Sequence, residues 1–197
     1  MATFKYGSLD ALPKPEFRKE LDQYWTPAYA VFELLKIEKF PQIIHEPGCG
    51  AGHISRALIN KGYNVVSSDL REPSYYGMGG IDFLKKEGQV DSIITNPPYV
   101  DLNRWLKKTI DLTLVKSALL VKLSGLVSKG RYEILRWVHG LRIYAFTTPL
   151  DRWDWKENKW KRGSAFSHAW FVIDKYSTHI PQFTWIDVKN PEPKDII

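Results

Sequence analysis

The 197-residue sequence contains one cysteine, Cys49, and no apolar run long enough to cross a membrane. A single cysteine excludes an internal disulfide framework and supplies no cluster for structural zinc. We interpret Cys49 as a small packing residue rather than a nucleophile. A membrane span needs about 20 consecutive apolar residues, and residues 1–17 lack the apolar core of a secretory signal peptide. These absences predict a cytoplasmic protein with no membrane partner.

Metal-ligand spacing and internal repeats are also missing. The five histidines, at positions 45, 53, 139, 168 and 179, do not have the spacing of a metal site, so we expect no bound metal. With 44% hydrophobic and 25% charged residues, the chain has the composition of one globular domain. We expect an N-terminal arm over residues 1–22, a domain over 23–188 and a flexible tail over 189–197.

Positive charge is concentrated in the second half of the chain. Residues 1–98 carry 11 basic and 12 acidic side chains, whereas residues 99–197 carry 17 basic and 10 acidic ones. Such asymmetry favours a polyanionic partner, with nucleic acid first and an anionic membrane second. The alternative is a solvated basic surface without a partner.

Short apolar strands alternate with helical stretches along the chain. The strands are expected at residues 42–45, 64–69, 90–95, 119–123, 142–147 and 169–174, and the helices at 28–40, 54–61, 106–114 and 132–138. Thr26 is expected as the N-cap of the first helix, and residues 70–80 read as a loop. This alternation predicts an α/β sandwich around a mainly parallel sheet. No helical stretch separates the last two strands, so the final one should run antiparallel.

A glycine-rich turn, Glu46-Pro-Gly-Cys-Gly-Ala-Gly52, lies between a strand and a helix. Gly48, Gly50 and Gly52 would let the backbone approach a ligand at the carboxyl edge of the sheet. The spacing differs from that of dinucleotide-binding and phosphate-binding loops. Asp69, at the end of the next strand, could accept both ribose hydroxyls of a nucleoside-type cofactor. A tight turn that only packs helix on strand is the alternative.

A second motif, Asn96-Pro97-Pro98-Tyr99, follows the strand at 90–95 and must end it, because prolines cannot donate to a sheet ladder. Together with the glycine turn and the preceding Tyr24-Trp25-Thr26-Pro27, this motif resembles the S-adenosylmethionine-dependent DNA adenine N6-methyltransferases of the small bacterial and phage type. The resemblance covers roughly residues 23–175. It implies a class I methyltransferase (Rossmann-like) sandwich, with a seven-stranded sheet whose last strand is antiparallel.

The resemblance also implies a role for each motif. Asn96 and Pro97 would accept the two N–H bonds of the target amino group, which draws a delocalised nitrogen lone pair towards the methyl donor. Pro98 would stiffen the turn, and Tyr99 would stack on a base extruded from the duplex. S-adenosylmethionine would be held by Thr26, Pro27, Glu46, Gly48, Gly50, Gly52, Asp69, Asp82 and Phe83.

A tryptophan-rich basic segment lies between the last two expected strands. Residues 151–162 contain five basic residues, three acidic residues and three tryptophans. Cations that meet phosphates and rings that stack on bases suit a nucleic-acid surface. The alternative is a hairpin whose tryptophans pack back onto the sheet. The candidate contacts in this 151–165 loop are Trp155, Lys156, Lys159, Trp160, Lys161 and Arg162.

These features predict an S-adenosylmethionine-dependent enzyme that methylates adenine N6 in DNA, in the cytoplasm of a bacterial or phage-infected cell. RNA adenine methylation, glutamine N5-methylation of a protein and a non-catalytic nucleic-acid-binding subunit are the alternatives. Little sequence remains outside the core for target recognition. We therefore expect a short or relaxed target site, or a protein partner that supplies specificity.

Overall fold

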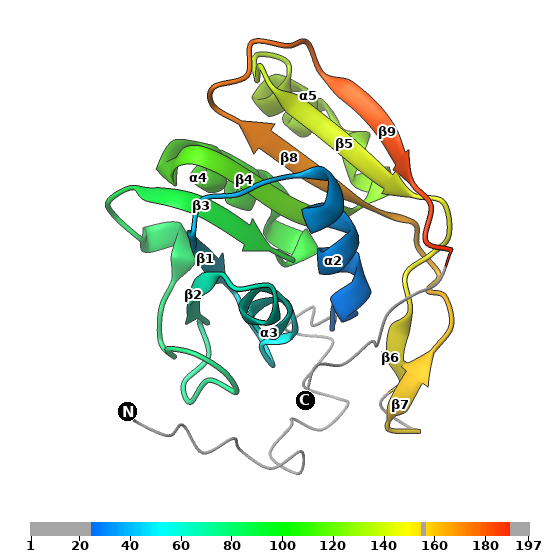
Figure 1. Ribbon diagram of the computed structural model, residues 1–197. Coiled ribbons are helices and arrows are strands. Elements are labelled where there is room, and N and C mark those ends of the chain that lie inside the picture. The colour runs from blue at the N-terminus through cyan, green and yellow to red at the C-terminus, as the bar shows by residue number, and fades with distance from the viewer. Residues whose placement is uncertain (1–24, 155–156, 190–197) are drawn as a thin grey trace.

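The computed structural model describes residues 25–154 and 157–189, and its centre is a seven-stranded sheet (Figure 1). The strand order is β2 (Asn64–Ser68), β1 (Ile43–Pro47), β3 (Val90–Thr95), β4 (Thr113–Lys122), β8 (His168–Asp174), β5 (Leu141–Phe146) and β9 (Gln182–Ile186). All neighbouring strands pair in parallel except β8, which is antiparallel to both β4 and β5. The expected α/β sandwich with one antiparallel strand is confirmed.

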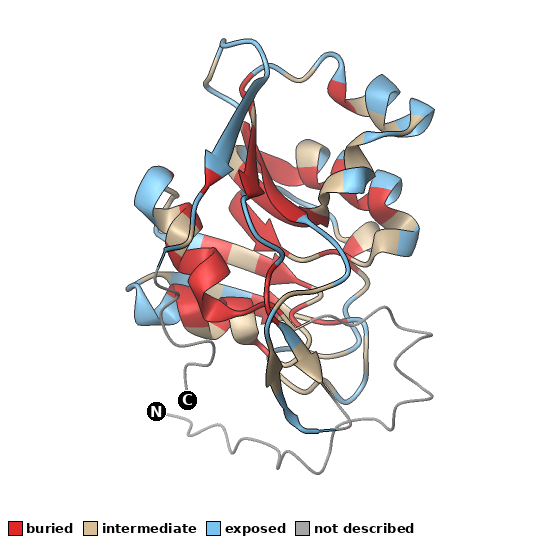
Figure 2. Cartoon of the chain, turned by 90° about the vertical axis from the view of Figure 1, so that its right-hand side faces the viewer, coloured by how far each residue is buried: buried red, intermediate tan, exposed pale blue. Residues whose placement is uncertain are grey.

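Helices cover both faces of this sheet, which explains why its central strands are buried apolar runs. The helices α2 (Ala28–Ile37) and α3 (His53–Asn60) pack on one face, against side chains such as Ile44, Leu120 and Trp170. The helices α4 (Leu102–Leu112) and α5 (Lys129–Leu135) pack on the other, against side chains such as Leu119 and Phe171. Figure 2 shows that the central strands are buried, while the helices combine buried and exposed residues.

Short elements decorate the carboxyl edge of the sheet. Three 3-10 helices lie at Phe83–Lys85 (η2), Tyr99–Asp101 (η3) and Leu123–Leu126 (η4). The expected basic loop contains a small hairpin of β6 (Arg152–Asp154) and β7 (Lys159–Lys161). In Figure 1 this hairpin extends away from the main sheet, near the start of α2.

The end of α2 is tied to the sheet by a cluster of charged side chains. Glu38, 5% exposed, accepts hydrogen bonds from Arg142 on β5, Lys116 on β4 and the Tyr144 hydroxyl. Burial would raise the pKa of Glu38, but these hydrogen bonds lower it overall. The cluster fixes the helix whose first turn leads into the candidate site.

Three sequence-based expectations are wrong. Thr26 does not cap α2, because the N-cap is Pro27, in an extended conformation and with no side-chain hydrogen bond. The third helix ends at Leu112 and β4 starts at Thr113, so Leu114 belongs to a strand. The chain also adds β9, which was not expected because Gln182-Phe-Thr-Trp-Ile186 is short and half polar.

Candidate functional site

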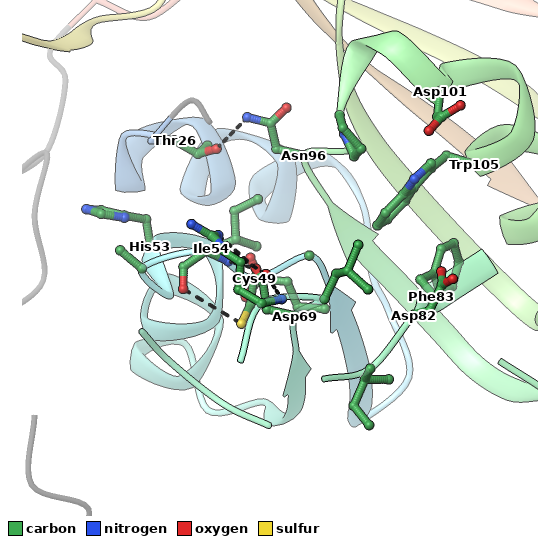
Figure 3. Close-up of a pocket in the computed structure, with 18 of the residues that line it drawn as sticks. Thr26, Cys49, His53, Ile54, Asp69, Asp82, Phe83, Asn96, Asp101 and Trp105 are labelled. Atoms are coloured by element: carbon green, nitrogen blue, oxygen red, sulfur yellow. Dashed lines mark hydrogen bonds and ion pairs between the residues drawn. The ribbon is translucent and has the colours of Figure 1, made fainter. Parts of the chain in front are cut away.

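A cavity of about 450 Å³ opens at the carboxyl edge of β1, β2 and β3 (Figure 3). Its volume lies within the range of small-molecule sites. Nine of the predicted residues line it: Thr26, Glu46, Gly48, Gly50, Asp69, Asp82, Phe83, Asn96 and Pro98. Pro27, Gly52, Pro97 and Tyr99 lie beside the lining, in segments contiguous with it.

The glycine turn forms the floor of the cavity. Gly48 and Gly52 both have positive φ angles, +66° and +78°, which side chains rarely adopt. A Cβ atom on Gly48 would lie 3.0 Å from the Trp105 ring, and one on Gly52 would lie 2.3 Å from the Tyr76 ring. Gly48 therefore keeps the cavity open, whereas Gly52 is needed for packing against the 70–80 loop.

Glu46 lines the cavity at the end of β1 but is only 2% exposed. The Ser55 hydroxyl donates to its carboxylate, and the Ser55 and Ser67 hydroxyls are 2.5 Å apart. Burial raises the pKa of Glu46 to about 8, despite the hydrogen bond from Ser55. The raised pKa favours the protonated form of this side chain at neutral pH.

Asp69 directly follows β2, and its carboxylate forms an ion pair with Arg71. The Arg71 guanidinium donates from Nε to Oδ1 and from Nη2 to Oδ2, both at 3.0 Å. The Gly50 N–H also donates to Oδ2, at 2.8 Å. Burial would raise the pKa of Asp69, but these donors lower it overall, so the group is a carboxylate. A ribose that binds Asp69 has to replace part of this ion pair.

The far wall of the cavity is aromatic and acidic. Phe83 is buried and its ring lies 4.5 Å from that of Trp105, on α4. Asp82 lines the cavity and also caps η2, because its Oδ1 accepts the Leu84 N–H at 3.0 Å. Asp82 Oδ2 lies 3.8 Å from Lys85 Nζ. Asp82 thus combines the local capping role with a position that faces the cavity.

Asn96 enters the cavity from the end of β3, opposite the glycine turn (Figure 3). Its Nδ2 donates to the buried Thr26 hydroxyl at 3.2 Å, and its Oδ1 accepts the Tyr99 hydroxyl at 3.3 Å. Thr95, directly before it, donates to the Pro47 carbonyl at 2.6 Å and joins β3 to β1. The carboxamide is thus held with its oxygen towards Tyr99.

Beyond Tyr99 lies a second group of side chains, outside the cavity lining. Lys122 Nζ is 4.4 Å from the Tyr99 ring centre and 4.0 Å from that of Phe166. His168, paired with Lys122 across β4 and β8, is 8% exposed. Burial first, and Lys122 second, lower the pKa of His168 to about 4, so its ring is neutral. The surroundings of Tyr99 are therefore aromatic with one positive charge.

The tryptophans of the hairpin pack against the mouth of the cavity. Trp153 and Trp160 face each other across β6 and β7, 5.6 Å apart. Trp153 lies 4.5 Å from Trp25, and Trp25 lies 4.3 Å from His53. Trp25 and His53 line the cavity, so the hairpin is continuous with its wall. Burial, with a smaller contribution from Arg56, lowers the pKa of His53 to about 3 and keeps the ring neutral.

The basic side chains of the hairpin lie next to carboxylates. Lys159 Nζ is 2.8 Å from Glu157, and Lys161 Nζ is 2.9 Å from Asp154 and also contacts Glu157. Arg162 has no ion-pair partner in the described parts of the chain. Trp155 and Lys156 lie outside the described residues.

Several cavity residues were not anticipated. Trp105 and Arg71 contribute to the wall and the Asp69 ion pair, and Ile54, Val100 and Asp101 complete the rim. His53 also lines the cavity. Within residues 25–154 and 157–189, no three potential metal ligands gather and no helix is long and apolar enough to span a membrane.

The fold is shared with solved methyltransferase structures, at low sequence identity. No protein-family model matches the sequence, and no curated protein matches it. A candidate RNA methyltransferase from Pyrococcus horikoshii aligns with a TM-score of 0.56 at 18% identity, over 84% of this chain and 89% of that one. A predicted O-methyltransferase from Agrobacterium tumefaciens aligns with a TM-score of 0.53 at 13% identity, over 82% and 85%.

A third structure, magnesium protoporphyrin IX methyltransferase from Synechocystis PCC 6803 with bound SAH, aligns with a TM-score of 0.50 at 15% identity, over 74% of this chain and 80% of that one. The mostly parallel seven-stranded sheet with one antiparallel strand matches the fold of these structures. The chain therefore has the class I methyltransferase fold, with a cavity at the carboxyl edge of its sheet.

Proposed function

We propose that this protein is an S-adenosylmethionine-dependent methyltransferase that methylates the exocyclic N6 of adenine in DNA. The observation that carries the proposal is the position of Asn96, whose carboxamide borders the cavity and is oriented by Thr26. The class I methyltransferase fold and the Asn-Pro-Pro-Tyr motif support the same conclusion.

The cavity residues suit the proposed cofactor. Gly48 leaves room above the turn, Asp69 offers a carboxylate for ribose, and Phe83 and Trp105 offer flat surfaces for an adenine ring. Glu46 lines the same cavity and would face the cofactor's ammonium group. When bound, S-adenosylmethionine supplies an electrophilic methyl group on sulfur.

The chain's own contribution is to position the acceptor nitrogen. Asn96 Oδ1 and the Pro97 carbonyl accept the two N–H bonds of the target amino group, so the lone pair is directed at the methyl donor. The long hydrogen bond from Tyr99 to Asn96 Oδ1 is exchanged for one from the substrate. A nitrogen–carbon bond forms as the sulfur–carbon bond breaks, and the excess proton passes to solvent. No strong base is required, because the nitrogen loses its proton after it has become cationic.

RNA adenine is the second candidate substrate. The likeness to a candidate RNA methyltransferase favours it, and the basic second half suits either nucleic acid.

The test is methyl transfer from labelled S-adenosylmethionine to DNA, RNA and protein pools, followed by mass spectrometry of the digested products. We expect N6-methyldeoxyadenosine, lost with Asn96→Ala and retained with the matched surface variant Asn103→Ala. N6-methyladenosine from RNA would reassign the substrate, and methylglutamine would reassign the class of acceptor. Cofactor binding with no product from any pool contradicts the proposal and favours a non-catalytic subunit.

A further inference from the structure

One edge of the sheet ends in an open, uncharged strand. β9 is last in the strand order and pairs with β5 alone among the described strands. Its sequence, Gln-Phe-Thr-Trp-Ile, has no charged residue, and four of the five residues are exposed (Figure 2). Phe183 is 48% exposed and Trp185 is 60% exposed. Such an edge presents unpaired backbone N–H and C=O groups, which are a template for another strand.

The opposite edge strand, β2, is covered at its carboxyl end, whereas β9 has no such cover among the described residues. The Met78 N–H donates to the Ser67 carbonyl at 3.0 Å, and the Asp69 N–H donates to the Met78 carbonyl at 2.8 Å. The 70–80 loop thereby closes the end of β2. Proteins commonly guard edge strands with charges, prolines or bulges. Pro181 directly precedes β9 and Asp187 directly follows it. Neither lies within the strand, so its five residues remain able to pair with another strand.

We propose that β9 pairs with β9 of a second copy of this chain, antiparallel and two-fold symmetric, with Thr184 on the axis. Residues directly opposite in an antiparallel pair point to the same face of the sheet. With Thr184 at the centre, Phe183 of each copy lies opposite Trp185 of the other. A centre at Phe183 would place Trp185 opposite Pro181, and a centre at Trp185 would place Phe183 opposite Asp187. The Thr184 register alone matches both aromatic side chains with aromatic partners.

The neighbouring structure is compatible with this pairing. Phe183 and Trp185 lie beside Ile143 and Ala145 of β5, on the face that carries α4 and α5, and their rings are 5.0 Å apart. The second copy would extend this row of rings across the axis and join the two sheets into one. The cavity lies at β1, β2 and β3, away from β9 in the strand order. The dimer therefore leaves both sites accessible and does not rest on the proposed function.

Single cysteines test the register on the full chain. Thr184→Cys places two thiols on the axis, with Cα atoms about 4.5–5.5 Å apart, within the range of a disulfide. Gln182→Cys is the matched control, because its two copies would be about 14 Å apart along the strands. The natural Cys49 is only 5% exposed, so it does not compete. We expect mild oxidation to link Thr184→Cys at least tenfold faster than Gln182→Cys. Equal rates, or no linkage of Thr184→Cys, overturn the proposal.

Sedimentation of the unmodified protein tests the dimer without a disulfide. We expect a concentration-dependent dimer that becomes monomeric with Trp185→Lys, while Val127→Lys, at a site 84% exposed on η4's C-terminal side, leaves it dimeric. A monomer at all concentrations overturns the proposal and leaves the edge to a different chain. A dimer that survives Trp185→Lys overturns it equally, because the contact would then lie elsewhere.

Discussion

Thr26 and Asn96, 70 residues apart in the sequence, are joined by a hydrogen bond of 3.2 Å from the Asn96 amide to the Thr26 hydroxyl. Thr26 is 3% exposed and precedes Pro27, the N-cap of α2, whose other end is held by the Glu38 cluster. The orientation of the candidate catalytic amide therefore depends on a helix on the other side of the site.

This contact predicts that Thr26 positions Asn96 for the proposed methyl transfer. We expect Thr26→Val, which removes the hydroxyl and keeps the shape, to lower kcat roughly 10–100-fold, because small misplacements of reacting groups are costly. Cofactor affinity should change little, and Thr26→Ser should restore most of the rate. The measurement is steady-state kinetics alongside cofactor titration. A loss of affinity with an unchanged kcat would instead assign Thr26 to the cofactor.

The ion pair between Arg71 and Asp69 predicts competition with the cofactor. Since Arg71 contacts both carboxylate oxygens, Arg71→Gln should free them and tighten binding of S-adenosylhomocysteine several-fold. Asp69→Asn should weaken it at least tenfold, because a hydrogen bond to a charged group contributes about 1.5–3 kcal/mol. Calorimetric titration measures both. Weaker binding by Arg71→Gln would mean that the guanidinium contacts the cofactor.

Glu46 predicts a pH dependence of stability. Its pKa is raised to about 8 in the folded protein, above the value of 4.5 expected when unfolded. The folded state therefore binds the extra proton, and the stabilisation present below pH 4.5 is lost as the pH rises to 8. The slope is up to about 1.4 kcal/mol per pH unit within that window.

Glu46→Gln is the control, since it cannot ionise. The free energy of unfolding is measured by urea titration at pH 5, 7 and 9. The value for Glu46→Gln minus that for the unmodified protein should increase as the pH rises. The difference between the two proteins removes the opposite contribution of His53, whose pKa is lowered to about 3. A constant difference across the three pH values contradicts the prediction.

The hairpin predicts unequal effects of its basic residues on nucleic-acid binding. Lys159 and Lys161 lie against Glu157 and Asp154, so part of their charge is already neutralised. We expect Arg162→Ala to reduce the slope of log affinity against log salt by about 1, and Lys159→Ala to reduce it less. Fluorescence anisotropy at several salt concentrations gives the slopes. Identical slopes for all variants would exclude the hairpin from phosphate contact.

Local motifs in the sequence were sufficient for six of the seven strands of the sheet and for much of the cavity lining. A few adjacent residues are enough to identify the positions of Gly48, Gly50 and Asn96, because turns and strand ends depend on short-range sterics. Contacts between distant segments could not be foreseen. The packing of Trp25 on His53 and Trp153 depends on tertiary geometry. The same holds for the Thr26 hydroxyl, which bonds Asn96 instead of capping its own helix. β9 was missed for a related reason, since a short strand containing Gln182 and Thr184 is stabilised mainly by its neighbour β5.

The hairpin is tied to the core at both of its ends by one residue. The Asp151 N–H donates to the Tyr29 hydroxyl at 2.9 Å, and the Asp151 carboxylate accepts the Gly163 N–H at 3.0 Å. Asp151 thus joins the two ends of the segment between positions 151 and 163 to each other and to α2. Because Asp151 holds both ends of this segment, a change in the length of the segment is expected to leave the sheet undisturbed.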